Sequence, residues 1–148
     1  MSNAAILACY RESPLWLDEP QLINGEQWTG MGGLYRLEVQ QIAGGIEAYY
    51  GFQWLKSVLV ADSTLTALAP GGIWRGSAPP AVPGTTPVTP YIILGFQSGI
   101  DVLTINAYRL MTQPLYQIRA FGPAAISTTI AAAAAEIDLL LARTSGTI

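Results

Sequence analysis

The last third of the chain places the strongest constraint on the fold. Three runs rich in β-branched and aromatic residues follow one another there, at residues 91–97, 100–111 and 115–121. Turn-forming residues separate these runs, at residues 98–99 and at residues 112–114. Runs of this kind between turn signals are typical of strands. The segment therefore predicts three strands.

A long helix is predicted after these strands. Gly122-Pro123 opens an Ala-rich segment, and proline is favoured at the first position of a helix. Apolar residues then recur at spacings of three and four, which places them on one side of a helix. They are Ile126, Ile130, Ala133 or Ala134, Ile137, and Leu140 or Leu141. The simplest arrangement is a small sheet covered by this helix.

Two shorter elements and a further helix are predicted in the middle of the chain. Apolar residues recur at helical spacing over residues 46–61. Asp62 suits the N-cap of a short helix over residues 63–69. Proline and glycine at residues 70–72 end that helix, and residues 73–76 predict a short strand.

Residues 1–44 differ from the rest of the chain. Turn signals, including the glycine-rich segment 30–33, separate isolated large apolar residues, and only residues 34–40 alternate well enough to predict a strand. Two interpretations remain open: an extended arm whose aromatic residues dock on a neighbour, or a hairpin that folds onto its own core. We divide the chain into an N-terminal extension at residues 1–44 and an α+β domain at residues 45–148.

Charged side chains are scarce. They make up 11% of the residues, whereas the apolar classes make up 51%. Ordinary soluble domains carry about 25% charged residues. A surface so poor in charge predicts that other subunits cover part of it.

The charge pattern and the uncharged stretches exclude two classes of partner. Acids outnumber bases in residues 1–47, and the few Lys and Arg residues beyond them are scattered, so no specific nucleic-acid binding is expected. Residues 76–100 contain five prolines, and residues 120–135 are shorter than the roughly 20 residues of a membrane span. We therefore expect no membrane partner. No secretory signal is visible either.

The residue types needed for most catalysis are missing. The chain has no histidine, which excludes Ser-His-Asp catalysis, Cys-His catalysis and histidine metal sites. Cys9 is the single cysteine, and the glycine cluster at residues 30–33 lacks the spacing of a dinucleotide-binding loop. The sequence predicts a protein that is not an enzyme and needs no metal or cofactor.

The proline-rich segment 77–90 allows two interpretations. It contains Pro-x-x-Pro spacings at residues 80–83 and 87–90, which are typical of polyproline ligands. Arg75 is the only basic residue beside it that could orient such docking. A stiff connecting loop is the favoured interpretation.

Residues 46–143 resemble a known family. The similarity rests on the segments 61–68, 72–76, 78–79, 90–93, 115–120 and 137–140 in this order. This pattern is similar to that of the bacteriophage tail-completion proteins, or tail terminators, and of the related neck proteins that join head to tail. The resemblance implies an α+β fold, in which an antiparallel sheet of about four strands packs against two or three helices.

The resemblance also implies a function. Copies of such a protein form a ring, a hexamer in most of the family, which terminates the tail tube and presents a surface to the head connector. The expected location is the virion tail or neck, and the host cytoplasm during assembly, with the genome passing through the ring lumen. A closed ring needs two different patches on each subunit.

Candidate residues for the subunit interface are aromatic or arginine, because these types are enriched at interface centres. They are Trp16, Trp28, Trp74, Tyr108, Arg109 and Arg119. Arg109 and Arg119 could instead face solvent across the sheet. The alternative function is a non-enzymatic protein-binding module that uses the proline-rich loop or the N-terminal arm. A third possibility, an enzyme, would require a cleft with convergent polar groups.

Overall fold

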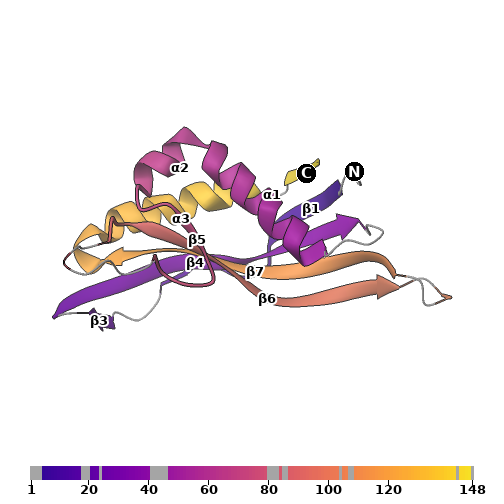
Figure 1. Ribbon diagram of the computed structural model, residues 1–148, viewed down its shortest axis with the longest axis horizontal. Helices are drawn as coiled ribbons and strands as arrows, with labels where there is room; N and C mark the ends of the chain where they lie inside the picture. The colour runs from indigo at the N-terminus through magenta and orange to yellow at the C-terminus, as the bar shows by residue number, and fades with distance from the viewer. Residues whose placement is uncertain are drawn as a thin grey trace.

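The protein is an α+β structure in which three helices lie on one face of a mostly antiparallel sheet (Figure 1). The computed structural model describes residues 5–17, 21–23, 25–40, 47–79, 84, 87–103, 105–106, 109–142 and 144–147. The helices are α1 (Glu47–Ala61), α2 (Ser63–Leu68) and α3 (Ser127–Leu141), with a 3₁₀ turn, η1 (Ala124–Ile126), before the last.

The sheet is larger than the four strands expected. Within the described residues it has eight strands in the order β5-β6-β7-β4-β1-β8, and β2 and β3 pair with β4. The strands are β1 (Ala5–Arg11), β2 (Trp16–Leu17), β3 (Gln21–Ile23), β4 (Glu26–Gln40), β5 (Ile73–Arg75), β6 (Tyr91–Leu103), β7 (Arg109–Pro123) and β8 (Thr144–Thr147). The additional strands come from the N-terminal third and from the C-terminal end of the chain.

The N-terminal third contributes the centre of the sheet. β4 pairs with β7 on one side and with β1 on the other, both antiparallel. Tyr35, Leu37 and Val39 of β4 are fully buried in the same core as the helices. The described part of residues 1–44 thus folds onto the core of its own chain.

The glycine-rich segment that indicates a turn in the sequence lies inside β4. Gly32 faces Arg119 of β7, and a Cβ atom at Gly32 would overlap the carbonyl oxygen of Ile118. Glycine is needed here because the backbone of β7 approaches too closely for a side chain. The glycine-rich segment therefore marks a close contact between two strands and not a turn.

The three strands expected over residues 91–121 are two long strands. Residues 98–99 lie within β6, where the register with β7 shifts between Phe96 and Ser98 as in a β-bulge. Pro114 lies within β7, opposite Gly99. The pairing between β6 and β7 outweighs the local turn preference of these residues.

A buried arginine supports β7 next to this proline. Nη1 of Arg36 donates a hydrogen bond of 2.9 Å to the carbonyl oxygen of Gln113, and Nε and Nη2 of Arg36 each lie 2.8 Å from the Glu12 carboxylate. Proline has no N–H to give to the ladder. The Arg36 guanidinium thus supplies a hydrogen bond where the ladder is interrupted.

The helices follow the sequence pattern closely. Asp62 caps α2 by accepting a hydrogen bond of 2.6 Å from the backbone N–H of Leu65. The predicted seam of α3 is confirmed, because its buried residues are Ile130, Ala133, Ala134, Ile137 and Leu141. All of these except Ala134 belong to the hydrophobic core between α3 and the sheet.

The segment Ala124–Leu141 is long and apolar enough to cross a membrane when length and composition alone are considered. A core helix of a globular protein passes the same test. In this structure one side of the segment belongs to the core, and Asp138 on α3 accepts a hydrogen bond of 3.2 Å from the Tyr35 hydroxyl. The helix therefore has a packing role within the fold.

Replacing Gly32 with alanine should destabilise the protein by about 1–3 kcal/mol, because β7 must move to admit the methyl group. Gly95→Ala is the matched control in the same sheet, since a Cβ there would lie 4.0 Å from the nearest atom, the carbonyl oxygen of Gln117. Chemical denaturation of the two variants measures the difference. Equal stabilities would contradict the close contact at Gly32.

Candidate functional site

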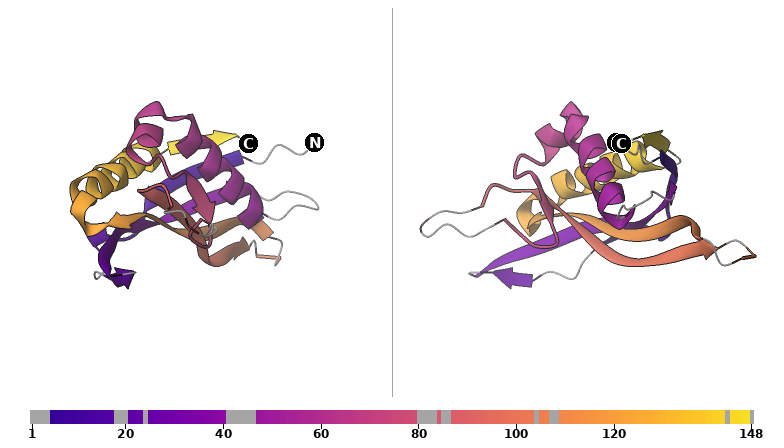
Figure 2. Two further views of the ribbon diagram at one scale, coloured as in Figure 1. Left: turned by 60° about the vertical axis from the view of Figure 1, so that its left-hand side comes forward. Right: turned by 45° about the vertical axis from the view of Figure 1, so that its right-hand side comes forward.

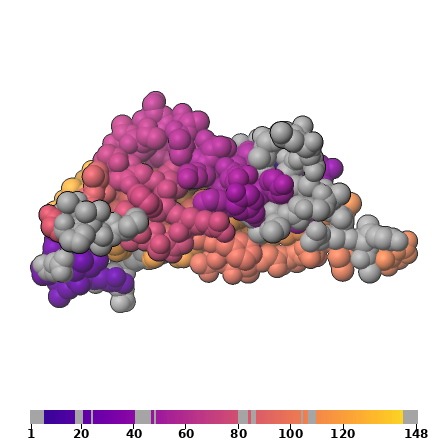
Figure 3. All heavy atoms as spheres, viewed as in Figure 1, coloured from indigo at the N-terminus to yellow at the C-terminus, as the bar shows by residue number. Residues whose placement is uncertain are grey.

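The outer parts of β6 and β7 form a hairpin that extends beyond the helices. We call the described part of residues 96–115 the distal hairpin, and Figures 1 and 2 show its strands continuing past α1. In Figure 3 the orange surface of these strands likewise runs past the magenta helices. One layer of the molecule is thus longer than the other.

The distal hairpin carries apolar side chains that no described part of the chain covers. Phe96, Ile100, Leu103 and Leu110 are each more than half exposed, and Ile105 at the tip is wholly exposed at 104%. Isolated exposed apolar residues are common, whereas several on one projecting element mark a contact surface. The hairpin is therefore a candidate docking element.

The outer edge of β6 is also open along the distal hairpin. β5 pairs with β6 only as far as Arg75 opposite Leu94, and the N–H of Gly76 donates the last hydrogen bond of 2.9 Å to the Leu94 carbonyl. Beyond that point, β7 is the only described strand that pairs with β6. An open edge of this kind can pair with a strand of another chain.

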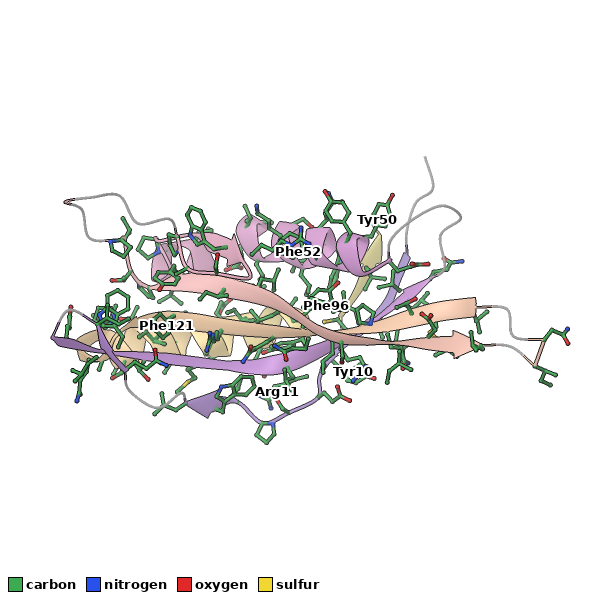
Figure 4. All side chains as sticks on the ribbon, turned by 60° about the horizontal axis from the view of Figure 1, so that its bottom comes forward. Tyr10, Arg11, Tyr50, Phe52, Phe96 and Phe121 are labelled. Atoms are coloured by element: carbon green, nitrogen blue, oxygen red, sulfur yellow. The ribbon has the colours of Figure 1, made fainter. Side chains whose placement is uncertain are left out.

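A pocket lies where β5 ends and the distal hairpin begins. Its volume is about 330 Å³, and its lining residues come from α1, β6, β7 and the end of β5. They are Tyr49, Phe52, Arg75, Gly76, Leu94, Phe96 and Tyr116. We call it the aromatic pocket; Figure 4 shows Phe52 on α1 and Phe96 on the strand that faces it.

The rim of the aromatic pocket holds a cation against aromatic rings. The guanidinium carbon of Arg75 lies 4.9 Å from the centre of the Phe52 ring and 6.0 Å from that of Tyr49. These are favourable cation–π distances. Within the described residues, no carboxylate lies within ion-pair distance of Arg75.

The floor of the pocket is fixed by a buried tyrosine. Tyr116 is 1% exposed, and its ring meets that of Phe96 edge-on with centroids 5.8 Å apart. Gly51 of α1 admits the Tyr116 hydroxyl, since a Cβ there would lie 2.7 Å from that oxygen. Burial raises the pKa of the Tyr116 phenol, so this side chain stays neutral.

The composition of the aromatic pocket suits binding. Its lining is mostly rings and aliphatic carbon, and its polar groups are phenols, one guanidinium and the backbone. Such a pocket accepts an apolar side chain, with a preference for a nearby negative charge at Arg75. None of its lining residues is a carboxylate, cysteine or histidine.

Three of the interface residues predicted from the sequence lie in one row across the sheet. Trp74 pairs with Ile93, Ile93 with Arg119, Arg119 with Gly32, and Gly32 with Trp16. Directly paired residues point to the same face of a sheet. The row lies on the face opposite the helices, because its neighbours Leu94 and Ile118 belong to the core.

Trp28 lies on the same helix-free face. Its ring centre is 5.7 Å from that of Phe121, and the Arg119 guanidinium carbon lies 5.9 Å from the same ring. Trp28 is 5% exposed, and its Nε1 has no hydrogen-bond partner among the described residues. Trp74 is 37% exposed, and its Nε1 donates to the Gly71 carbonyl.

Of the remaining two predicted interface residues, only Arg109 has a described backbone position. Arg109 is the first residue of β7 and pairs with Leu103; its side chain is outside the described part of the chain. Tyr108 is also outside the described residues. The structure thus places four of the six predicted residues on the helix-free face and the backbone of Arg109 at the hairpin end.

The proline-rich segment is only partly described. Residues 80–83 lie outside the described residues, and Pro90 is buried at the start of β6 with its carbonyl oxygen accepting a hydrogen bond of 3.0 Å from the Gly71 N–H. A polyproline ligand presents both prolines of its motif to a groove. The motif at residues 87–90 does not do so in this structure.

Sequence patterns missed the aromatic pocket. Phe96 belongs to an apolar run that predicts a strand, yet it is 56% exposed, because it lies at the edge of the part of the sheet that α1 covers. Phe52 and Tyr116 are 64 residues apart in the chain and meet only through helix–sheet packing. Comparisons of the chain with protein-family models, curated proteins and solved structures found no match.

The buried phenol of Tyr116 should not ionise in the folded protein near the ordinary tyrosine pKa of about 10. The Tyr116→Phe variant should therefore keep the full absorbance change of the folded protein in an alkaline titration. In denaturant the same variant should lose part of that change, because all seven tyrosines then ionise.

The sign of the effect on stability follows from linkage. A pKa raised in the folded state stabilises it below pH 10, and this contribution is lost as the pH rises through the folded pKa. A smaller absorbance change for folded Tyr116→Phe near pH 10 would contradict the burial of this phenol.

Proposed function

We propose that this chain is a structural virion protein of a tailed bacteriophage. In this proposal its copies form a ring that terminates the tail tube and joins it to the head connector. The observation that carries the proposal is the distal hairpin, a projecting element with exposed apolar side chains and an open strand edge. Such an element gains stability when another copy covers it.

The composition of the chain supports the same proposal. Only 11% of its residues are charged, so a monomer would have few charged side chains on its solvent-exposed surface. The resemblance of residues 46–143 to tail-terminator and neck proteins gives the assembly its place in the virion. Its location would be the tail or neck, after assembly in the host cytoplasm.

The helix-free face is the proposed contact for the tail tube or the connector. Its cross-strand row combines tryptophan with arginine, the residue types that dominate binding energy at interfaces. The helices cover the opposite face and leave this one available. The ring contacts and the partner contacts would thus use different surfaces of the subunit.

Size-exclusion chromatography with light scattering tests ring formation directly. The expected result is a species of several copies of the 15.8 kDa chain that appears as a ring in negative-stain images. A protein that remains monomeric at high concentration would overturn the proposal.

Antibody labelling tests the place in the virion. Gold-labelled antibodies against this chain should bind at the junction of head and tail in particles of the phage that encodes it. Label confined to the capsid shell or to the distal tail tip would contradict the proposed role.

Replacing Ile100 with aspartate should weaken the assembly without unfolding the subunit. Ile100 is 54% exposed on the distal hairpin, and burying such a side chain contributes about 1.5–3 kcal/mol, roughly a tenfold to hundredfold change in association. Light scattering over a concentration series measures this change. Leu139→Asp on α3, at a side chain 74% exposed, is the matched control and should assemble normally.

A further inference from the structure

We propose that the tip of the distal hairpin of one copy inserts Ile105 into the aromatic pocket of the next copy. The inference rests on the proposed function, because it names the contact that joins neighbouring subunits of the ring. It assigns a knob and a hole to two different surfaces of the same chain.

The tip of the distal hairpin presents an exposed apolar side chain that can bind in a pocket. Ile105 lies in the turn between β6 and β7, where glycine, asparagine and aspartate are the favoured residues. It is wholly exposed, and Leu103 and Leu110 behind it are each 55% exposed. A branched apolar side chain at this position makes no packing contribution to the described part of its own chain.

The aromatic pocket is a matching receptor. Its volume of about 330 Å³ is at the lower end of the range for ligand sites, which suits a single aliphatic side chain and its flanking backbone. Tyr49, Phe52 and Phe96 offer carbon surfaces around the opening. Phe96 is 56% exposed, so the site is accessible from outside.

The occupant of the pocket must come from another copy. Ile105 is nine residues beyond Phe96 along β6, which corresponds to about 30 Å of extended strand. The distal hairpin continues past α1, which lines the pocket (Figure 1). The tip therefore cannot fold back into the pocket of its own chain.

The charges on the two surfaces are complementary. Arg75 at the rim stacks on rings and has no carboxylate within ion-pair distance among the described residues. Asp101 is an exposed acid on the β6 strand that leads to the tip, where its Oδ1 accepts a hydrogen bond of 2.9 Å from Thr112. Asp101 precedes Ile105 by four residues, about 13 Å of extended strand, so its carboxylate attracts the guanidinium during the approach of the hairpin and forms no direct ion pair. Added salt should weaken this attraction.

The contact is heterologous, because a hairpin tip meets a pocket and not a second tip. Each subunit then has one free tip and one free pocket, and successive copies add head to tail. A head-to-tail series closes into a ring when the rotation between neighbours divides the circle. This is the geometry that a tail ring requires.

Cysteine cross-linking of the full chain tests the contact. Ile105→Cys marks the tip, and Tyr49→Cys marks the pocket rim, where Tyr49 is 44% exposed. The native Cys9 is 0% exposed, and burial raises the pKa of its thiol to about 12, so it does not react while the protein is folded. A short bismaleimide joins thiols only where tip and rim are close.

The expected results are specific. A mixture of the two single variants should give covalent dimers, whereas neither variant alone should cross-link. The double variant should give a ladder of covalent species that ends at the number of copies in the ring.

Other outcomes separate the inference from the proposed function. Rings in negative stain without cross-links would overturn the tip-in-pocket contact and leave the ring intact. A ladder that stops at dimers would support the contact and overturn the ring. Cross-linking of Ile105→Cys alone would show a tip-to-tip contact and overturn the inference.

A substitution pair gives an independent measurement. Ile105→Ser should raise the concentration needed for assembly at least tenfold, because it removes the apolar knob. Asn106→Ser, at the adjacent exposed tip residue, should leave that concentration unchanged. Both side chains lie outside the core, so the thermal stability of the subunit should stay the same, and equal assembly of the two variants would overturn the inference.

Discussion

The pairing of β4 with β7 is the interaction on which the rest of the structure depends. The two strands have 15 residues each and stay in register from Trp28 opposite Pro123 to Gln40 opposite Met111. β6 lies on the far side of β7, and β1 on the far side of β4. The helices pack on one face of this framework and reach only part of its length.

The difference in length between the two layers produces both candidate docking elements. Where helices cover the sheet, the side chains of β6 are core residues such as Leu94. Where the helices stop, the same face of β6 shows Phe96, and α1 contributes the other wall of the aromatic pocket. Farther along, β6 and β7 continue without cover as the distal hairpin. The aromatic pocket and the distal hairpin thus follow one another along the β6–β7 strand pair.

Helices were easier to predict from the sequence than strands. The seam of α3 and the Asp62 cap depend on residues close together in the chain, so local patterns were sufficient to predict them. The lengths of β4, β6 and β7 depend on neighbours far away. Three segments have the composition of turns although they lie within strands. They are the glycines around Gly32, the bulge after Phe96 and the segment around Pro114, where Arg36 supplies a hydrogen bond.

The same difference between local patterns and long-range pairing applies to the candidate sites. Trp16, Trp74 and Arg119 were selected by residue type alone, and strand pairing places them in one row that no sequence spacing indicates. The aromatic pocket was not predicted, because Phe52, Arg75 and Tyr116 come from three separate elements. Its one local feature, an arginine and a glycine at the end of a short strand, occurs in many proteins without a pocket.

The interruptions in the sheet have a mechanical consequence. The bulge of β6 after Phe96 and the proline of β7 at Pro114 lie at the same level of the ladder, since Gly99 faces Pro114. Fewer regular hydrogen bonds cross the sheet there than in an unbroken antiparallel pair. The distal hairpin begins at this position, so bending strain concentrates there. The distal hairpin can tilt at this point while the part of the sheet under the helices keeps its curvature.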